Sequence, residues 1–241
     1  MRQRPFTSVP RSVVALAVLA LATQVVFAVL QAHPQARAEQ LPAPPSAPVL
    51  RAMSLGDPIP LAQLWTLWLQ AFDNQPGISI PFLDLDYGKV EAWLQRILQL
   101  DPHGQYPLMM ASQLYAQVPD ERKQRQMLDF VHREFLGDPN RRWPWMAHAA
   151  IMARHRLNDL PLALSFARDL AAHATAPNVP HWAGQMQIFL YEDMGEYETA
   201  RVLLGGLLDS GAVQDPHEIH FLIERLNKLK EAEKSSQPSE N

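Results

Sequence analysis

The sequence predicts an all-α protein, an α-solenoid of about four helix pairs with an N-terminal capping helix, preceded by one transmembrane helix. The first observation behind this prediction is the spacing of Pro107, Pro144, Pro180 and Pro216, which lie 37, 36 and 36 residues apart. Each precedes a stretch with helical hydrophobic periodicity. Proline is tolerated at the first helical position, because the N–H that it lacks has no partner there. A fixed period of this length is typical of stacked helix pairs, which offer long surfaces for binding other proteins.

The second observation is the start and stop signals of the expected helices. First helices are predicted near 86–100, 120–136, 159–175 and 196–209, and second helices near 107–117, 144–157, 180–194 and 216–230. The first helices begin at Asp86, Asp120, Asp159 and Glu196, and acidic residues suit both capping and the positive end of the helix dipole. Proline or glycine follows the predicted ends, which favours helices that stop there.

The N-terminal residues predict export of the rest of the chain. Residues 1–11 carry three arginines and are expected in the cytoplasm, and residues 12–30 form an apolar run about 28 Å long as a helix, close to the thickness of a bilayer core. This predicts a single-pass protein of a bacterial inner membrane with its C-terminal domain in the periplasm. The alternative is a signal peptide cleaved after Ala36-Arg37-Ala38, which would leave a soluble periplasmic protein.

Composition divides the remaining chain. Residues 31–48 are rich in proline and alanine and are expected to be a tether, 49–83 to hold capping helices and a connector, 84–230 the helical repeats, and 231–241 a flexible polar tail. Trp65 and Trp68 lie on the apolar side of the expected capping helix and are predicted to cover the first repeat.

Charge and cysteine content exclude several classes of function. A net charge of −4 does not favour a nucleic-acid partner, and the absence of cysteine excludes disulfides and thiolate metal sites. No phosphate-binding loop or nucleophile motif is present, so we expect neither a cofactor nor catalysis.

Residues 84–230 resemble the tetratricopeptide-repeat (TPR) family, specifically its divergent members. The helix–turn–helix unit, its length, and ends such as Leu100-Asp101-Pro102 match the family. The unit is 36–37 residues instead of 34, and the W-x2-L-G-x2-Y signature is intact in no unit, so the family's carboxylate-clamp positions do not transfer. An anchored, exported TPR domain has the layout of bacterial envelope accessory proteins, such as translocon-associated chaperone subunits and cytochrome c assembly factors.

The resemblance implies a binding face, since first helices line the concave groove of TPR-like solenoids. On the polar side of the predicted first helices lie the candidate partner-binding residues Arg96, Gln99, Asp129, His132, Arg133, Arg168 and Asp169. The predicted function is a non-catalytic scaffold or chaperone-like accessory that binds a segment of another envelope protein in this groove. The alternative for each single residue is an ordinary solvated helix surface.

Three other clusters suggest different chemistry. Glu192, Asp193, Glu196 and Glu198 could serve a carboxylate-dependent, peptidoglycan-acting enzyme, which needs an acid with a raised pKa in an apolar cleft. His217 and His220 are spaced i, i+3 and do not match the metalloprotease pattern. Basic clusters at residues 141–142 and 154–156 could hold acidic partners or lipid head groups. A purely structural oligomer is the remaining alternative.

Overall fold

The computed structural model describes residues 10–30 and 38–236 and contains two compact units. The first unit holds α1 (Arg11–Leu30), a 20-residue helix whose side chains are all exposed. Its length and apolar composition are sufficient to cross a membrane, as predicted for residues 12–30, and a signal sequence has the same properties.

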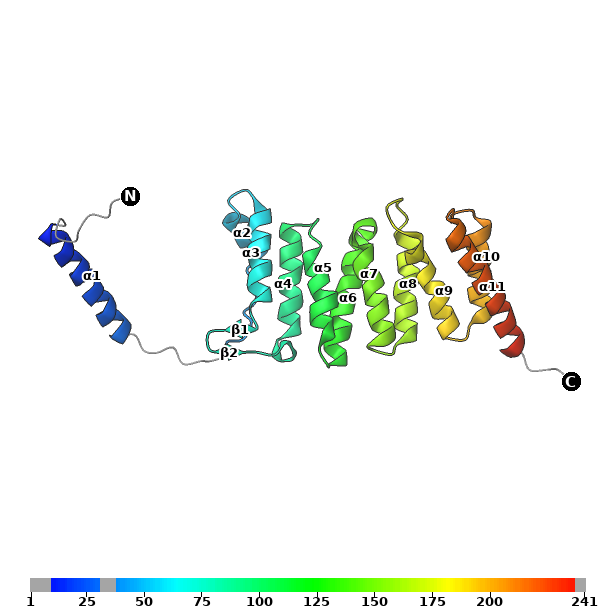
Figure 1. Ribbon diagram of the computed structural model, residues 1–241, viewed down its shortest axis with the longest axis horizontal. Coiled ribbons are helices and arrows are strands. Elements are labelled where there is room, and N and C mark those ends of the chain that lie inside the picture. The colour runs from blue at the N-terminus through cyan, green and yellow to red at the C-terminus, as the bar shows by residue number, and fades with distance from the viewer. Residues whose placement is uncertain (1–9, 31–37, 237–241) are drawn as a thin grey trace, which may run out of the picture. The chain divides into compact units, whose positions relative to one another are not determined.

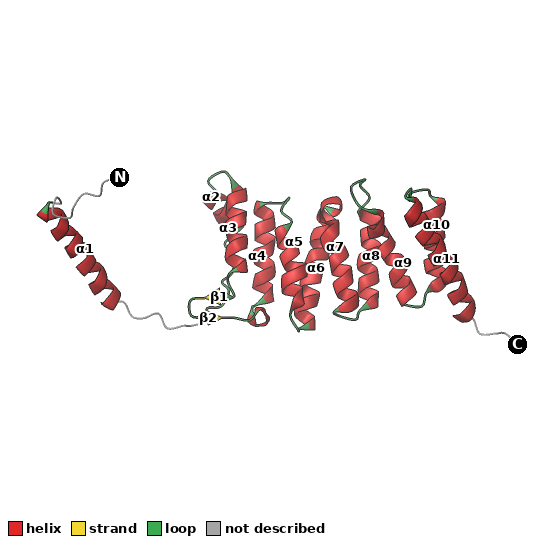
Figure 2. Cartoon of the chain, viewed as in Figure 1, coloured by secondary structure: helices red, strands yellow, loops and turns green. Residues whose placement is uncertain are grey.

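The second unit begins at Glu39 and is a row of helices (Figure 1). In the part of the chain that the structure describes, its α-helices are α2 (Ala47–Met53), α3 (Pro58–Gln70), α4 (Tyr87–Leu100), α5 (Tyr106–Met109), α6 (Glu121–Gly137), α7 (Pro139–His155), α8 (Leu160–His173), α9 (His181–Asp193), α10 (Tyr197–Asp209) and α11 (Pro216–Ser236). Strands β1 (Asn74–Gln75) and β2 (Ile78–Ser79) form the small sheet seen in Figure 2. The predicted all-α class is therefore confirmed.

Helices that follow each other in the chain pack against each other. This holds for every consecutive pair from α6 to α11 and for α3 with α4. After α5 the chain continues through a π-helical turn (Met110–Leu114) and a 3-10 turn (Tyr115–Gln117), so the predicted helix over 107–117 is helical but changes its winding.

Aspartate caps explain where most of the first helices begin. The side chain of Asp86 accepts hydrogen bonds from the backbone N–H groups of Gly88 and Lys89, and those of Asp120 and Asp159 each accept one from the residue three positions later. Each cap satisfies a backbone donor that the helix leaves without a partner. Glu196 occupies the same position before α10 but makes no capping hydrogen bond.

The four evenly spaced prolines do not all open helices. Pro107 is the second residue of α5, Pro180 precedes α9, and Pro216 is the first residue of α11. Pro144 lies inside α7, which begins at Pro139, so the predicted start at residue 144 is wrong. Near the start of a helix a proline removes only one backbone hydrogen bond, which lets α7 continue through it. The first-helix caps, at residues 86, 120, 159 and 196, are accordingly 34, 39 and 37 residues apart instead of evenly spaced.

The boundary between tether and folded unit lies earlier than predicted. Leu41 is only 2% exposed, and the indole Nε1 of Trp93 donates a 2.8 Å hydrogen bond to the carbonyl of Pro42. The side chain of Gln75 pairs with the backbone N–H and carbonyl of Glu39, at 2.8 and 2.9 Å. Residues 39–48 therefore belong to the folded unit, because their apolar and backbone polar groups have partners in it, while residues 31–37 of the predicted tether lie outside the described residues.

The C-terminal tail is also shorter than predicted. Helix α11 continues to Ser236, past the expected tail boundary at residue 231, and residues 237–241 lie outside the described part of the chain.

Two hydrophobic clusters form the core of the row. The larger extends from Leu41 to Leu190, and the smaller holds Ile188, Ala200, Leu204, Val213, Leu222 and Leu229. At the N-terminal end the rings of Trp65 and Trp68 each lie 4.8 Å from the ring of Trp93 on α4. Both tryptophans of α3 therefore cover the first helix pair, as predicted.

Candidate functional site

The predicted partner-binding residues are distributed over α4, α6 and α8. On α4, Arg96 donates a 2.6 Å hydrogen bond to Gln99 of the same helix. Asp129 on α6 and Arg168 on α8 are exposed. Three others, His132, Arg133 and Asp169, take part in contacts between neighbouring first helices.

Glu91 of α4 joins two residues of α6. Its carboxylate pairs with the guanidinium of Arg133 through one oxygen, and its other oxygen accepts a 2.7 Å hydrogen bond from the amide of Gln126. Both carboxylate oxygens of Glu91 therefore accept hydrogen bonds, one from a charged donor, Arg133, and one from a neutral donor, Gln126. These bonds hold α4 and α6 in register.

His132 and Asp169 make the corresponding connection between α6 and α8. The ring Nε2 of His132 lies 2.7 Å from Oδ2 of Asp169, and the imidazole is 5.1 Å from the ring of Phe166. Both side chains are partly buried, at 24% and 35% exposure. Part of the polar side of these first helices is therefore fixed by cross-helix pairs, while Asp129 and Arg168 remain exposed beside them.

A hollow of about 440 Å³ lies along α8 beside this pair. Its polar lining comes from Ser165, Arg168 and Asp169. Its apolar lining comes from Pro161, Leu164, Ala172 and, from the turn after α9, Met194. A volume in this range suits a small ligand or a few side chains of a peptide. The hollow places the exposed guanidinium of Arg168 beside the Asp169 carboxylate, which His132 engages, and between apolar walls.

A further connection between first helices was not predicted. Arg125 of α6 pairs with Asp159, the cap of α8, at 2.7 Å, and with Glu121 at 2.9 Å. The backbone N–H of Leu162 and the side chain of Arg125 hold the pKa of the Asp159 carboxyl below its usual value. The sequence feature that could have predicted this pair is its spacing. Arg125 and Asp159 carry opposite charges and lie 34 positions apart, about one repeat.

Two of the four residues of the predicted acidic cluster, Glu192 and Asp193, form ion pairs, while Glu196 and Glu198 are exposed. Both carboxylate oxygens of Glu192 accept hydrogen bonds from Arg225, one of them at 2.8 Å from Nε, and Asp193 pairs with Arg154 at 2.6 Å. The Arg225 guanidinium also lies 4.5 Å from the centre of the Phe189 ring. These contacts join α7 and α11 to α9, so Arg154 of the predicted basic cluster on α7 has a partner within the protein.

Among the remaining sequence candidates, Arg142 and His217 make contacts within the protein, and the side chains of His217 and His220 are exposed. Arg142 is buried and binds Glu134 and the carbonyl of Pro102. The backbone N–H of His217 donates to Asp215, at the start of α11. Nowhere in residues 10–30 and 38–236 do three His, Asp or Glu side chains come together as a possible metal site.

Comparisons with known proteins add no relative. No family model matches the chain, and no curated protein or solved structure matches it either. The candidate site is therefore defined by its own geometry.

Proposed function

We propose that this protein is a non-catalytic, TPR-like scaffold or chaperone-like accessory of a bacterial envelope complex. In this proposal α1 anchors it in the inner membrane, the row of helices lies in the periplasm, and a segment of another envelope protein binds along α6 and α8. The observation that carries the proposal is the hollow on α8, lined by Arg168 and bounded by Met194.

Rigidity of the surrounding face favours binding. The pairs Arg133–Glu91 and His132–Asp169 fix side chains that would otherwise lose rotamer freedom when a partner arrives. Among the described residues no carboxylate pairs with Arg168, since its neighbour Asp169 is engaged by His132. Arg168 is therefore the residue of this face best placed to recognise a partner carboxylate, and a bidentate arginine contact gives such recognition its geometry.

The repeat character of the row supports the TPR-like assignment. Contacts between units recur at similar separations, such as 34 residues for Arg125 with Asp159 and 37 for His132 with Asp169. Such recurrence is typical of solenoids, in which each unit contacts its neighbours. The arginines before α1 support the proposed orientation through the positive-inside rule.

The surroundings of the acidic cluster support a non-catalytic role, because two of its residues are ion-paired and the other two, Glu196 and Glu198, are exposed. A carboxyl group that acts as a general acid needs an apolar pocket and access to substrate. Glu192 and Asp193 instead face the guanidinium groups of Arg225 and Arg154. We therefore prefer the scaffold over the peptidoglycan-acting enzyme.

The test is crosslinking capture of the full-length tagged protein from intact cells, compared with the variants Arg168→Glu and Arg122→Glu. Both arginines are exposed, and Arg122 of α6 is not part of the hollow. A tagged chain of residues 1–48 controls for proteins captured through the anchor alone. We expect Arg168→Glu to lose the specific partner at least tenfold, the scale of about 1.4 kcal/mol, and Arg122→Glu to retain it. Equal capture by both variants would show that the hollow is not the binding site.

A further inference from the structure

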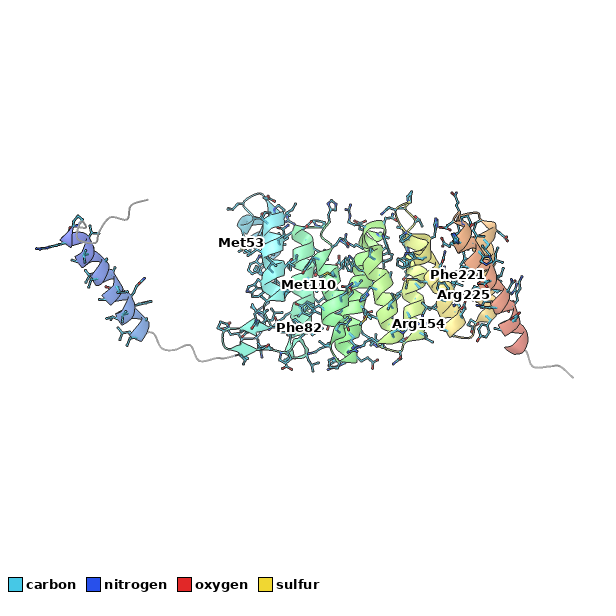
Figure 3. All side chains as sticks on the ribbon, viewed as in Figure 1. Met53, Phe82, Met110, Arg154, Phe221 and Arg225 are labelled. Atoms are coloured by element: carbon cyan, nitrogen blue, oxygen red, sulfur yellow. The ribbon has the colours of Figure 1, made fainter. Side chains whose placement is uncertain are left out.

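The turn between α2 and α3 forms an exposed aliphatic tip. Four large aliphatic side chains in this turn and in the two adjoining helices are exposed, namely Val49, Met53, Leu55 and Ile59, at 49%, 48%, 95% and 49%. Met53 is labelled at this end of the row in Figure 3. Single exposed apolar residues are normal on protein surfaces, but a contiguous group of them marks a surface that meets another apolar phase.

The backbone of Leu55 is in an unfavourable conformation. Its φ of +51° lies in the left-handed region, which few residues other than glycine and asparagine adopt. Asn158 has nearly the same φ, +53°, and is of the type that tolerates it. The Leu55 side chain is almost fully exposed, so packing within the protein does not compensate for the strain. Leu55 directly follows Ser54, the C-cap of α2, so this conformation ends the helix and leaves the Leu55 side chain exposed at the tip.

The helix that follows the tip carries no charge. Residues 58–72, PIPLAQLWTLWLQAF, contain no acidic or basic side chain, and Leu64 and Leu67 on α3 are 59% and 63% exposed. The terminal element of a solenoid normally needs a polar outer face to remain soluble. An uncharged helix near the end of the row instead suits contact with an apolar environment.

The length of the connection to α1 determines whether the tip can reach the bilayer surface. Only residues 31–38 separate Leu30, the end of α1, from Glu39, and nine Cα–Cα steps span at most about 30 Å. Helix α3 has 13 residues and is therefore about 20 Å long. Glu39 is bonded to Gln75, beyond the far end of α3 from the tip. If α1 is in the membrane, the connection is longer than α3 and therefore allows the tip to reach the bilayer surface.

We propose that the α2–α3 tip inserts into the headgroup–acyl boundary of the bilayer that holds α1. This inference rests on the membrane anchoring in the proposed function. Aliphatic side chains on a turn can enter a fluid interface without a complementary surface, and Arg51 and Asp57 beside the tip balance each other, so we expect no requirement for anionic lipid. Two attachments, α1 and the tip, then restrict how the row of helices is oriented to the membrane.

The absence of cysteine makes a direct test possible. We would place a single cysteine by Leu55→Cys in the full-length chain, attach an environment-sensitive fluorophore, and reconstitute the protein in phosphatidylcholine vesicles with and without doxyl-labelled lipid. The matched control is Val202→Cys on α10, whose native side chain is 59% exposed. We expect a blue shift and at least twofold quenching by doxyl lipid for the Leu55 probe and neither effect for the Val202 probe. Met53→Cys provides a second probe, in case the label at residue 55 alters the strained turn.

Each other outcome overturns the proposal. Quenching at residues 53 and 55 no greater than at residue 202 would place the tip in water. A blue shift without quenching by lipid would show that a second copy of the chain covers the tip. If the protein floats with vesicles after an alkaline wash but the tip probes stay unquenched, only this inference fails. If the protein does not float, the anchoring part of the proposed function fails with it.

Discussion

Replacing Leu41 with alanine tests where the folded unit begins. Leu41 is 2% exposed and belongs to the larger hydrophobic cluster, although it lies in the stretch that composition marks as a tether. Leucine-to-alanine changes in cores cost about 2–5 kcal/mol, and a site at the end of the row can partly collapse, so we expect about 2–3 kcal/mol. For a unit of this size that corresponds to a fall in Tm of about 4–12 °C.

The assay is unfolding of the full-length protein in detergent micelles, followed by circular dichroism during heating and in guanidinium chloride. The control is Leu64→Ala, which removes the same atoms from a side chain that is 59% exposed, and it should change the free energy of unfolding by less than about 0.5 kcal/mol. Trp93→Phe should act in the same direction as Leu41→Ala, because it removes the donor to the Pro42 carbonyl. If Leu41→Ala and Leu64→Ala behave alike, residues 39–48 are a tether and our assignment of them to the folded unit is refuted.

Three further predictions concern buried polar groups and strain. Arg142→Met should lower the free energy of unfolding by about 2–4 kcal/mol, because Glu134 and the Pro102 carbonyl lose their hydrogen-bond donor. Arg142→Lys should not restore the lost stability. Denaturant titration of both variants checks this. Burial lowers the pKa of His148 in the folded protein, so His148 binds a proton more tightly in the unfolded chain. Tm should therefore be highest above pH 6.5, the usual histidine pKa, and decline as the pH falls below it. The substitution His148→Gln should weaken this pH dependence of Tm. Leu55→Gly should raise the free energy of unfolding by about 0.5–1 kcal/mol, because glycine adopts a positive φ without strain; an unchanged or lower value would contradict this.

Features of the fold that depend on neighbouring residues were predictable from the sequence. Asp86, Asp120 and Asp159 were expected to start helices, and they do, because a cap needs only backbone groups two or three residues away. Pro144 was misleading for a related reason. A proline near a helix start is compatible both with opening the helix and with lying in its first turns, and only the position of Pro139 decides between them.

Features that depend on distant residues were not predictable in this way. The burial of residues 39–48 follows from contacts such as that between Trp93 and Pro42, which are 51 positions apart. No local pattern in a proline-rich stretch reveals that a tryptophan in a later helix will satisfy its carbonyl groups.

The candidate site shows the same division. Helical periodicity placed His132, Arg133, Arg168 and Asp169 on the polar side of their helices. It could not show that His132 meets Asp169, nor that Glu91 is the partner of Arg133, because those pairs depend on the stagger between helices. Met194 belongs to a turn, and it reaches the hollow on α8 only because α9 packs against that helix.

The division of the core into two clusters has a consequence for motion. Helix α9 contributes Ala183 and Leu190 to the larger cluster and Ile188 to the smaller one, whose other members lie on α10, on α11 and in the loop between them. The last two helices can therefore open as a unit of their own, and we expect their amide hydrogens to exchange before those of α6–α8. Met194 stands at the joint between these parts and also forms one wall of the α8 hollow. A segment bound in that hollow would slow amide exchange in α10 and α11, although it does not touch them. Hydrogen exchange in these two helices would therefore report binding at the hollow.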